Sequence, residues 1–205
     1  MAYIDGFVIP VPTASKQEFL DHANTVDKFF LDYDALRVVE CWADDVPEGK
    51  VTDFRRSVAA TEEESVVFSW IEWPDMPTRD AAMTAMETNE AMMAQPMPFD
   101  GKRMIFGGFV PMVDARTDGT TGYIDGFVSP VAPDKRDAYF RLAEMGAKKF
   151  LTCGALRSVE HWGDDVPDGK VTDFRRAVQG TADELIVFSR SNGPTRRRAT
   201  PAGPS

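Results

Sequence analysis

The sequence predicts an α+β fold in which a ferredoxin-like βαββαβ unit occurs twice in tandem, the second copy reduced to βαββ. The first observation is a repeat: residues 3–69 recur at 123–189 without a gap, beginning with Tyr-Ile-Asp-Gly-Phe-Val in both copies. The second is the order of strand-like and helix-like segments in the first copy, which matches the split βαβ layout. The third is that the likeness ends after Ser189, before a second helix and fourth strand.

Each element of the first repeat has its own signal. Residues 3–11 are rich in β-branched and aromatic side chains, which is typical of a strand. Ser15 and Glu18 have the spacing of a capping box, and apolar residues follow at helical spacing. Residues 51–59 fit either a short helix or a strand. The other expected elements are a strand at 36–43, a loop at 44–50, a strand at 66–73, a helix at 77–93 and a strand at 104–112.

The second repeat lacks the signals for its last helix and strand. Their absence would leave apolar surface and an unpaired strand edge, to be covered by repeat one or by another chain. We therefore expect a complete domain at 1–113, a linker at 114–121, a truncated repeat at 122–189 and a tail at 190–205. The tail is rich in Arg, Pro, Gly and Ser and is predicted to be disordered. With suitable codons for residues 191–195, a one-base shift of the reading frame would yield Val-Glu-Trp-Pro-Asp, close to residues 71–75, so we hypothesise a frameshift origin.

The composition limits the classes of partner and the cellular compartment that we expect. The formal net charge of −10 disfavours nucleic acid and anionic membranes as partners. Two cysteines, Cys41 and Cys153, are too few for a disulfide framework, and no apolar run approaches the roughly 20 residues of a membrane span. The N-terminus has no basic, apolar leader. We expect a cytoplasmic protein with no metal and no cofactor.

Five motifs, in order, resemble the bacterial YbaA-like family. They are Tyr-Ile-Asp-Gly-Phe-Val from Tyr3, Ala-Leu-Arg-Val-Val-Glu-Cys-Trp from Ala35, Asp-Val-Pro-Glu-Gly-Lys-Val-Thr-Asp-Phe-Arg from Asp45, Val-Val-Phe-Ser-Trp-Ile-Glu-Trp-Pro from Val66, and Met-Pro-Phe-Asp-Gly-Lys-Arg-Met-Ile-Phe-Gly-Gly-Phe from Met97. The resemblance implies a dimeric α+β barrel made by two ferredoxin-like units, with no agreed activity and no assigned catalytic residues. Self-association is therefore expected, as an intrachain pseudo-dimer or a homodimer.

A dense polar set follows the second expected strand in both repeats. Glu40 and Trp42 lie two residues apart, so their side chains project from one face of the sheet. Inside a barrel, burial would raise the pKa of Glu40 and suit it to acid–base chemistry. The alternative is an ion-pair network, Glu40 with Arg37 or Asp53 with Lys50, that only fixes the loop. Candidates for catalysis are Glu40, Asp53 and Arg55, and those for ligand binding are Arg37, Trp42, Asp44, Asp45, Lys50, Phe68, Trp70, Glu160, Trp162, Lys170, Asp173 and Arg175.

Aromatic residues suggest the kind of ligand. A set comprising Phe7, Trp42, Phe68, Trp70 and Trp73 could line a cavity for a planar apolar molecule, although aromatics at strand spacing also form ordinary core. We therefore expect a protein that binds a small apolar or aromatic molecule inside the barrel. The alternatives are a non-catalytic oligomerisation protein and a cofactor-independent monooxygenase or isomerase, the latter by analogy of fold alone.

Overall fold

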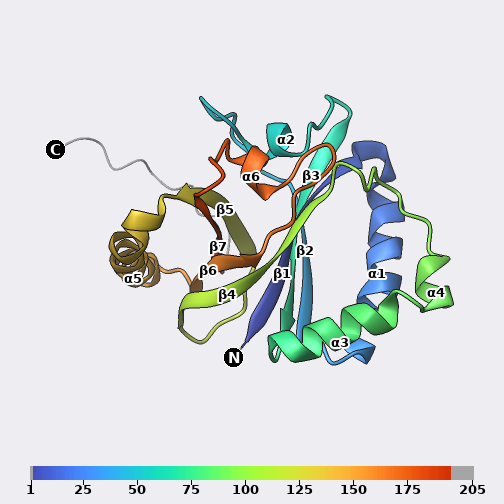
Figure 1. The fold of residues 1–205 in the computed structure, drawn as a ribbon, viewed down its shortest axis with the longest axis horizontal. Coiled ribbons are helices and arrows are strands. Elements are labelled where there is room, and N and C mark those ends of the chain that lie inside the picture. The colour runs from blue at the N-terminus through green and yellow to red at the C-terminus, as the bar shows by residue number, and fades with distance from the viewer. Residues whose placement is uncertain (1, 195–205) are drawn as a thin grey trace.

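A computed structural model describes residues 2–194 of the chain. Seven strands form one antiparallel sheet in the order β2-β3-β1-β4-β6-β7-β5. The sheet is curled, and the long helices lie on its outer, convex side (Figure 1). The strands are β1 (Tyr3–Pro12), β2 (Arg37–Trp42), β3 (Glu64–Trp73), β4 (Ile105–Arg116), β5 (Tyr123–Val131), β6 (Arg157–Asp165) and β7 (Leu185–Gly193).

Both repeats arrange their strands in the same way. Repeat one has the order β2-β3-β1-β4 and repeat two the order β6-β7-β5, so that within residues 2–194 only β4 has no counterpart strand. The predicted ferredoxin-like unit and its βαββ second copy are thus confirmed. Strand β4 also pairs with β6, from Gly108 opposite Asp165 to Arg116 opposite Arg157, and so joins the two repeats into one sheet.

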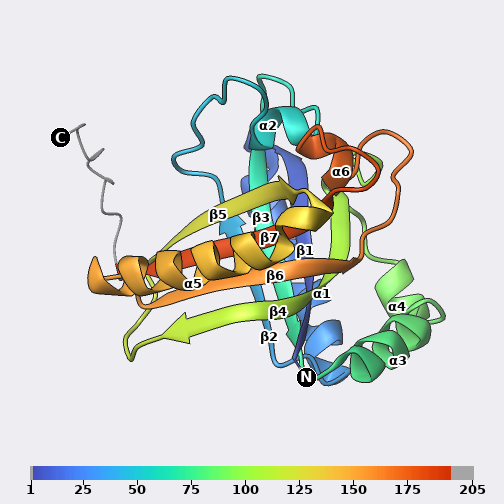
Figure 2. The same ribbon diagram turned by 60° about the vertical axis from the view of Figure 1, so that its left-hand side comes forward.

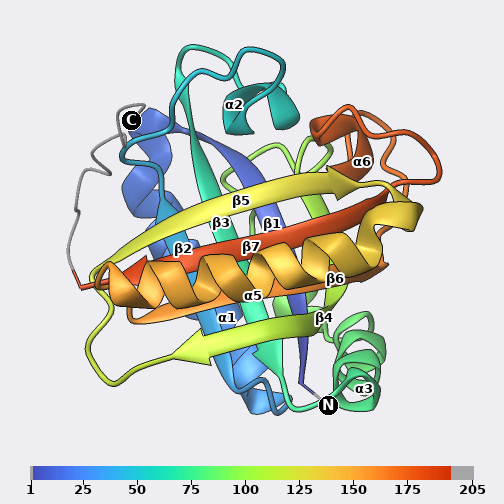
Figure 3. The ribbon, with the colours of Figure 1, turned by 90° about the vertical axis from the view of Figure 1, so that its left-hand side faces the viewer.

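The helices cover the convex face and one end of the sheet. Helix α1 (Lys16–Asp32) packs on β2 and β1, and α3 (Met76–Met86) packs on β3, with α4 (Glu90–Met93) after it. Helix α5 (Arg136–Thr152) packs on β4 and β6 and runs roughly along the strands of repeat two (Figure 3). The short helices α2 (Phe54–Ser57) and α6 (Phe174–Ala177) lie side by side at one end (Figure 2). Single 3-10 turns precede the long helices, Thr13–Ser15 before α1 and Pro133–Lys135 before α5.

The concave side of the sheet is filled by a core that both repeats build. Phe68 and Phe188, which occupy equivalent positions in the repeat, stack with ring centroids 4.6 Å apart and planes at 3°. Phe109 from β4 and Phe174 from α6 pack against Phe188. In this core, apolar side chains of each repeat are buried by contact with the other repeat. The two repeats therefore stabilise one another.

Some local predictions about repeat one were wrong. Ser15 is the last residue of a 3-10 turn and makes no side-chain capping bond, so there is no capping box. The helix predicted at 77–93 is interrupted, because Asn89 has an extended backbone and its side chain accepts from the Met92 amide to start α4. Strand β4 continues to Arg116, past the expected domain end, because β6 provides hydrogen-bond partners that far.

The last strand extends into the predicted tail. Strand β7 continues to Gly193, pairing with β5 on one side and β6 on the other, so disorder from residue 190 was wrong for the first four residues. Arg190 replaces the Trp70 of repeat one and is buried at 1% exposure. Its guanidinium lies 4.1 Å from the Trp70 ring centroid and donates to Glu72 at 2.8 Å. Burying an arginine at a core position is costly, and its Nε and Nη1 have no hydrogen-bond partner among the described residues.

The part of the predicted tail from residue 195 lies outside the described residues, and the frameshift hypothesis stays a hypothesis. No helix between residues 2 and 194 is long and apolar enough to cross a bilayer.

Candidate functional site

A groove of about 790 Å³ lies between the two edge strands of the sheet, β2 and β5. Its floor is apolar and is formed by side chains that also belong to the shared core, including Phe68, Val66 and Phe54. The loop after β2 and residues 123–129 of β5 border it. The other apolar residues that line it include Cys41, Ala43, Ile105, Ile124 and Val128.

The groove is acidic. The aspartates that border it are Asp44, Asp45, Asp53 and Asp125, and no Lys, Arg or His is among the described residues that line it. The pKa of Asp125 is raised by partial desolvation and by the nearby negative charge of Asp45. A site of this composition attracts cations, repels anions and imposes no such cost on uncharged molecules.

Glu40 does not face the groove, contrary to the prediction that it lies inside the barrel. It borders the groove along the strand edge, but its carboxyl lies beneath α1, where it interacts with Ser69 and with Asp27. Burial, followed by the charge of Asp27, raises the pKa of Glu40 to about 8. Burial also raises the pKa of Asp27, to about 6. The predicted partner Arg37 is exposed and lies instead 4.0 Å from Glu72.

The predicted aromatic lining is divided between the two faces of the sheet. Phe68 and Trp70 point to the concave core, and Phe68 lines the groove. Trp42 packs against Phe19 of α1 on the convex side, where the ammonium of Lys16 lies 5.0 Å from its ring centroid. Phe7 and Trp73 also belong to the convex side. The alternation of side chains along a strand separates them, so only part of the set can contact one ligand.

Asp53 and Arg55 hold the loop around α2. Asp53 accepts from the Arg56 amide at 2.9 Å and the Gly49 amide at 3.3 Å, and so caps α2. Arg55 donates to the carbonyls of Glu64 and Thr61 at 2.8 and 2.6 Å. In repeat two, Asp173 and Arg175 make the matching bonds around α6, to the Arg176 and Gly169 amides and the Glu184 and Thr181 carbonyls. Lys50 and Lys170 are exposed.

The same loops join the two repeats. Thr52 donates its hydroxyl to the Ala177 carbonyl at 2.8 Å, and the equivalent Thr172 donates to the Ser57 carbonyl at 2.7 Å. These reciprocal bonds are what a pseudo-twofold relation between the repeats produces. The polar set therefore contributes to the interface between the repeats, with partners other than the ion pairs that the sequence suggested.

Replacing Asp53 with alanine is expected to destabilise the protein by about 1–2 kcal/mol, because α2 loses its side-chain cap. Asp173→Ala should cost a similar amount, since it caps α6 in the same way. Urea unfolding of both variants measures the effect. A role of Asp53 in ligand binding alone would instead leave the free energy of unfolding unchanged.

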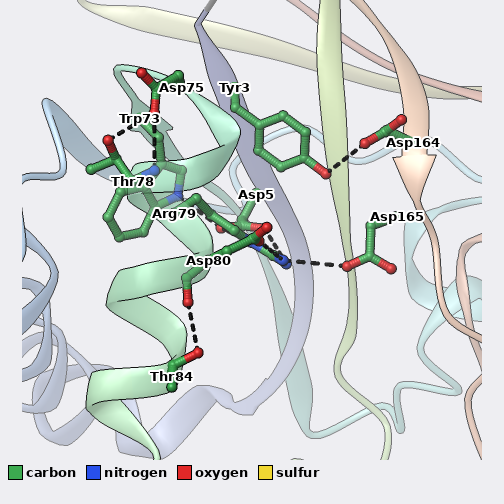
Figure 4. A network of polar contacts seen from close by, with 10 residues as sticks. All are labelled: Tyr3, Asp5, Trp73, Asp75, Thr78, Arg79, Asp80, Thr84, Asp164 and Asp165. Atoms are coloured by element: carbon green, nitrogen blue, oxygen red, sulfur yellow. Dashed lines mark hydrogen bonds and ion pairs between the residues drawn. The ribbon is translucent and has the colours of Figure 1, made fainter.

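A polar network around the first residues of β1, partly buried, was not predicted from the sequence. Arg79 of α3 pairs with Asp5 at 2.9 Å and with Asp165 of repeat two at 3.3 Å, while the Trp73 indole donates to Asp5 at 2.8 Å (Figure 4). Tyr3 donates to Asp164 at 3.2 Å. The recurrence of the Asp-Gly pair at 5–6 and 125–126 could have marked Asp5 as a candidate residue. Nothing in the sequence pointed to Arg79 as its partner.

In repeat two Glu160 and Trp162 lie under α5. Glu160 accepts from the Tyr139 hydroxyl at 3.0 Å, and Trp162 packs on the Tyr139 ring with centroids 5.4 Å apart. Burial raises the pKa of Glu160, and hydrogen bonds from Tyr139 and Ser189 oppose that rise. A pocket of about 190 Å³ lies beside Glu160 and is separate from the groove between β2 and β5, although Phe127 and Ser129 border both.

One repeat of this chain is similar to YbaA, an uncharacterised protein of Escherichia coli K12. The two are 52% identical over 116 residues, which is 56% of this chain and 99% of the relative. The YbaA of Shigella flexneri matches to the same extent. These relatives therefore have the length of a single repeat.

Solved structures with a similar fold have little sequence in common with the chain. Two are named "putative monooxygenase", from Fusobacterium nucleatum (TM-score 0.53, 9% identity, covering 93% of this chain and 75% of that one) and Lactobacillus acidophilus (0.54, 8%, 95% and 77%). A third is described as an anthrone oxidase-like protein (0.50, 13%, 95% and 74%). They support the dimeric α+β-barrel type of fold, here built from two repeats of one chain.

A family model described as "Protein of unknown function (DUF1428)" matches residues 2–101 and again residues 122–200. Both repeats are thus covered, as the recurrence of their motifs led us to expect. The chain belongs to the DUF1428 family, with its domain present twice in tandem.

Proposed function

We propose that the protein binds a small planar aromatic molecule, uncharged or cationic, in the groove between β2 and β5. The observation that carries this proposal is the combination of an aromatic floor and an acidic border in one groove. Phe68 is held by its stack on Phe188 and offers a rigid apolar surface for a ring. The charged residues that line the groove, among those the structure describes, are all acidic and add an electrostatic preference.

The electrostatic preference narrows the class of ligand. Phosphorylated, sulfated and carboxylated molecules would place an anion among several aspartates, which costs free energy at the short distances within a groove. Uncharged polycyclic or cationic aromatic molecules incur no such cost. The ligand in this proposal is therefore not a nucleotide-type cofactor.

Binding, rather than acid–base catalysis by Glu40, is the activity that we propose. The carboxyl of Glu40 lies beneath α1, on the opposite face of the sheet from the groove floor. A reacting group has to come within hydrogen-bond reach of the atom whose proton it transfers. Enzymatic activity like that named for the structural neighbours stays an untested alternative, because at their low identity they support the fold alone.

The reciprocal hydrogen bonds of Thr52 and Thr172 favour a second role, which belongs to the polar residues around α2 and does not involve the groove. In that role the polar residues from Thr52 to Arg56 hold the two repeats together and contact no ligand. Formation of a homodimer from two whole chains stays a prediction.

Two matched fluorescent probes test the proposal. N-phenyl-1-naphthylamine is uncharged, and 8-anilino-1-naphthalenesulfonate adds a sulfonate to a closely similar ring system. We expect the uncharged probe to bind with one site per chain and the sulfonate to bind at least about tenfold more weakly. Equal binding of both would contradict the electrostatic part of the proposal, and binding of neither would contradict the whole.

A larger side chain that fills the groove should weaken binding of the uncharged probe. Val128 lines the groove from β5, so Val128→Trp is expected to weaken binding at least about tenfold by occupying its volume. Leu142→Trp on the exposed face of α5 adds the same side chain elsewhere and serves as the control. Probe binding that survives Val128→Trp in a folded protein would place the probe outside the groove.

A further inference from the structure

A second pocket lies on the convex side of repeat two, beside α5 and over β5, β6 and β7. Its volume is about 190 Å³. Tyr139 and Phe150 line this α5 pocket from the helix, and the strands contribute residues that include Glu160 and Ser189. The floor of the groove between β2 and β5 belongs to the concave core, so the two sites lie on opposite faces of the sheet.

The position of α5 makes room for the α5 pocket. In repeat one α1 packs on both β2 and β1, whereas α5 packs on β6, the counterpart of β2, and on β4. The counterpart of β1 is β5, so α5 is displaced towards β4 relative to the position of α1 (Figure 3). The pocket lies beside the helix, over strands whose counterparts are covered by α1 in repeat one.

Three side chains around the pocket are smaller and more polar than their counterparts in repeat one. The pairs are Ile9 and Ser129, Val38 and Ser158, and Ile71 and Ser191. Ile9 and Ile71 are core residues of repeat one, at 5% and 2% exposure. Each exchange removes apolar volume and adds a hydroxyl, so positions that fill a core in repeat one line a polar pocket in repeat two.

A carboxyl group with a fixed orientation lies in the α5 pocket. Tyr139 donates its hydroxyl to Glu160 at 3.0 Å, and Ser189 donates to the same carboxyl. Repeat one has Phe19 in place of Tyr139, so the bond from the tyrosine is particular to repeat two. A carboxylate can accept about four hydrogen bonds, which leaves about two for a ligand.

The charges at the pocket favour a cation. Of the described residues that line it, Glu160 and Arg190 are charged, and the Arg190 guanidinium lies on the concave side against Trp70. Burial raises the pKa of Glu160, and an ammonium group beside the carboxyl would oppose that rise and favour the ionised form. An ammonium group also has three donors to share between the carboxylate and the serine hydroxyls.

We infer that the α5 pocket binds a small primary alkylammonium ion, with the ammonium group on Glu160. Phe127 and Phe150, which line the pocket and are 43% and 42% exposed, contact the alkyl group at its rim. A cavity of about 150 Å³ holds benzene, so a pocket of about 190 Å³ admits roughly six to eight non-hydrogen atoms. This inference goes beyond the binding of aromatic molecules in the groove and does not depend on it.

Three matched compounds test the inference on the full chain. At neutral pH 3-methylbutylamine is an ammonium ion, 3-methylbutanol is its uncharged counterpart and 3-methylbutanoate is an anion of the same shape. In a titration followed by amide nuclear magnetic resonance, the amine should cause saturable shifts at Ser158, Ser189 and Ser191. We expect the alcohol to bind at least about tenfold more weakly and the carboxylate not to bind. Equal binding of amine and alcohol, or amine shifts that spread over the acidic surface and spare these serines, would overturn the inference.

Two variants test the pocket itself. Glu160→Gln keeps the shape of the side chain and removes its charge, so it should abolish most of the preference for the amine over the alcohol. The double variant Ser158→Val with Ser191→Ile restores the residues of repeat one and should weaken amine binding at least about tenfold by filling the pocket. Circular dichroism verifies that both variants are folded. Unchanged amine affinity in either folded variant would overturn the inference.

Val128→Trp is the matched control, because it fills the groove on the opposite face of the sheet. The amine should bind this variant as it binds the unmodified chain. Amine binding that is lost in Val128→Trp and survives in the double variant would place the amine in the groove and overturn the inference. Amine binding without binding of N-phenyl-1-naphthylamine contradicts only the proposed function, and the reverse result contradicts only this inference.

Discussion

Replacing Phe188 with alanine is expected to lower the free energy of unfolding by about 3–5 kcal/mol, as for other buried phenylalanines. Phe188 is fully buried, and its ring contacts Phe68, Phe109 and Phe174. These partners come from both repeats, so the cavity cannot close by movement of one side chain. The loss should appear in one cooperative transition, because the repeats share the core.

The equivalent substitution in repeat one provides a matched comparison. Phe68 occupies the same position, but it borders the groove between β2 and β5. Water from the groove can enter the space that Phe68→Ala opens, so we expect a smaller loss, about 2–3 kcal/mol. Urea unfolding followed by far-ultraviolet circular dichroism measures both. Equal losses, or a second transition in Phe188→Ala, would contradict a shared core that is open on one side.

Replacing Glu40 with glutamine is expected to stabilise the protein at pH 8 and above by a few kcal/mol. Burial raises the pKa of Glu40 to about 8 in the folded protein, from an ordinary value of 4.5. Each pKa unit corresponds to about 1.4 kcal/mol of difference between the two states. Glutamine is uncharged at every pH and therefore avoids the cost of ionising a carboxyl beneath α1.

The sign of the pH dependence follows from the direction of the shift. Below pH 4.5 Glu40 is protonated in both states and contributes no pH dependence. Between pH 4.5 and 8 the unfolded chain releases the proton while the folded protein keeps it, so stability falls as pH rises. Above pH 8 the loss is complete. Asp27, with a pKa raised to about 6, adds a loss of the same sign.

Glu160→Gln is the matched control for Glu40→Gln. The pKa of Glu160 is also raised by burial, but Tyr139 and Ser189 donate hydrogen bonds to its carboxyl and limit the rise. We therefore expect a smaller gain from Glu160→Gln at pH 8. Denaturant titrations from pH 4 to 9 check both variants. A Glu40→Gln protein whose stability falls with pH as steeply as the unmodified protein would show that Glu40 is charged when folded.

The architecture of each repeat was largely predictable because it depends on local patterns. Strand and helix periodicity, Pro47 and Gly49 in the loop, and the recurrence of residues 3–69 all lie in short stretches of sequence. The ends of elements were harder to predict. Strand β4 reaches Arg116 and β7 reaches Gly193 because neighbouring strands pair with them, and those partners are distant in sequence.

The candidate site was predicted less well. Glu40 and Trp42 share a face, as their spacing required, but which face turns towards α1 is decided by packing. Asp53 and Arg55 belong to a capped loop, because backbone amides and carbonyls were nearer than any ionic partner. The network of Arg79 joins residues from both repeats, and no local pattern records such a contact.

The sequence by itself determined the tandem repeat, the βαββ form of the second copy and the acidic character of the chain. Only the tertiary structure decided that β4 joins the repeats through β6, and that the groove lies between the two edge strands of the described sheet. The physical reason is that periodicity fixes which side chains share a face. The partner of each face and edge depends instead on hydrogen bonds and packing between segments far apart in the chain.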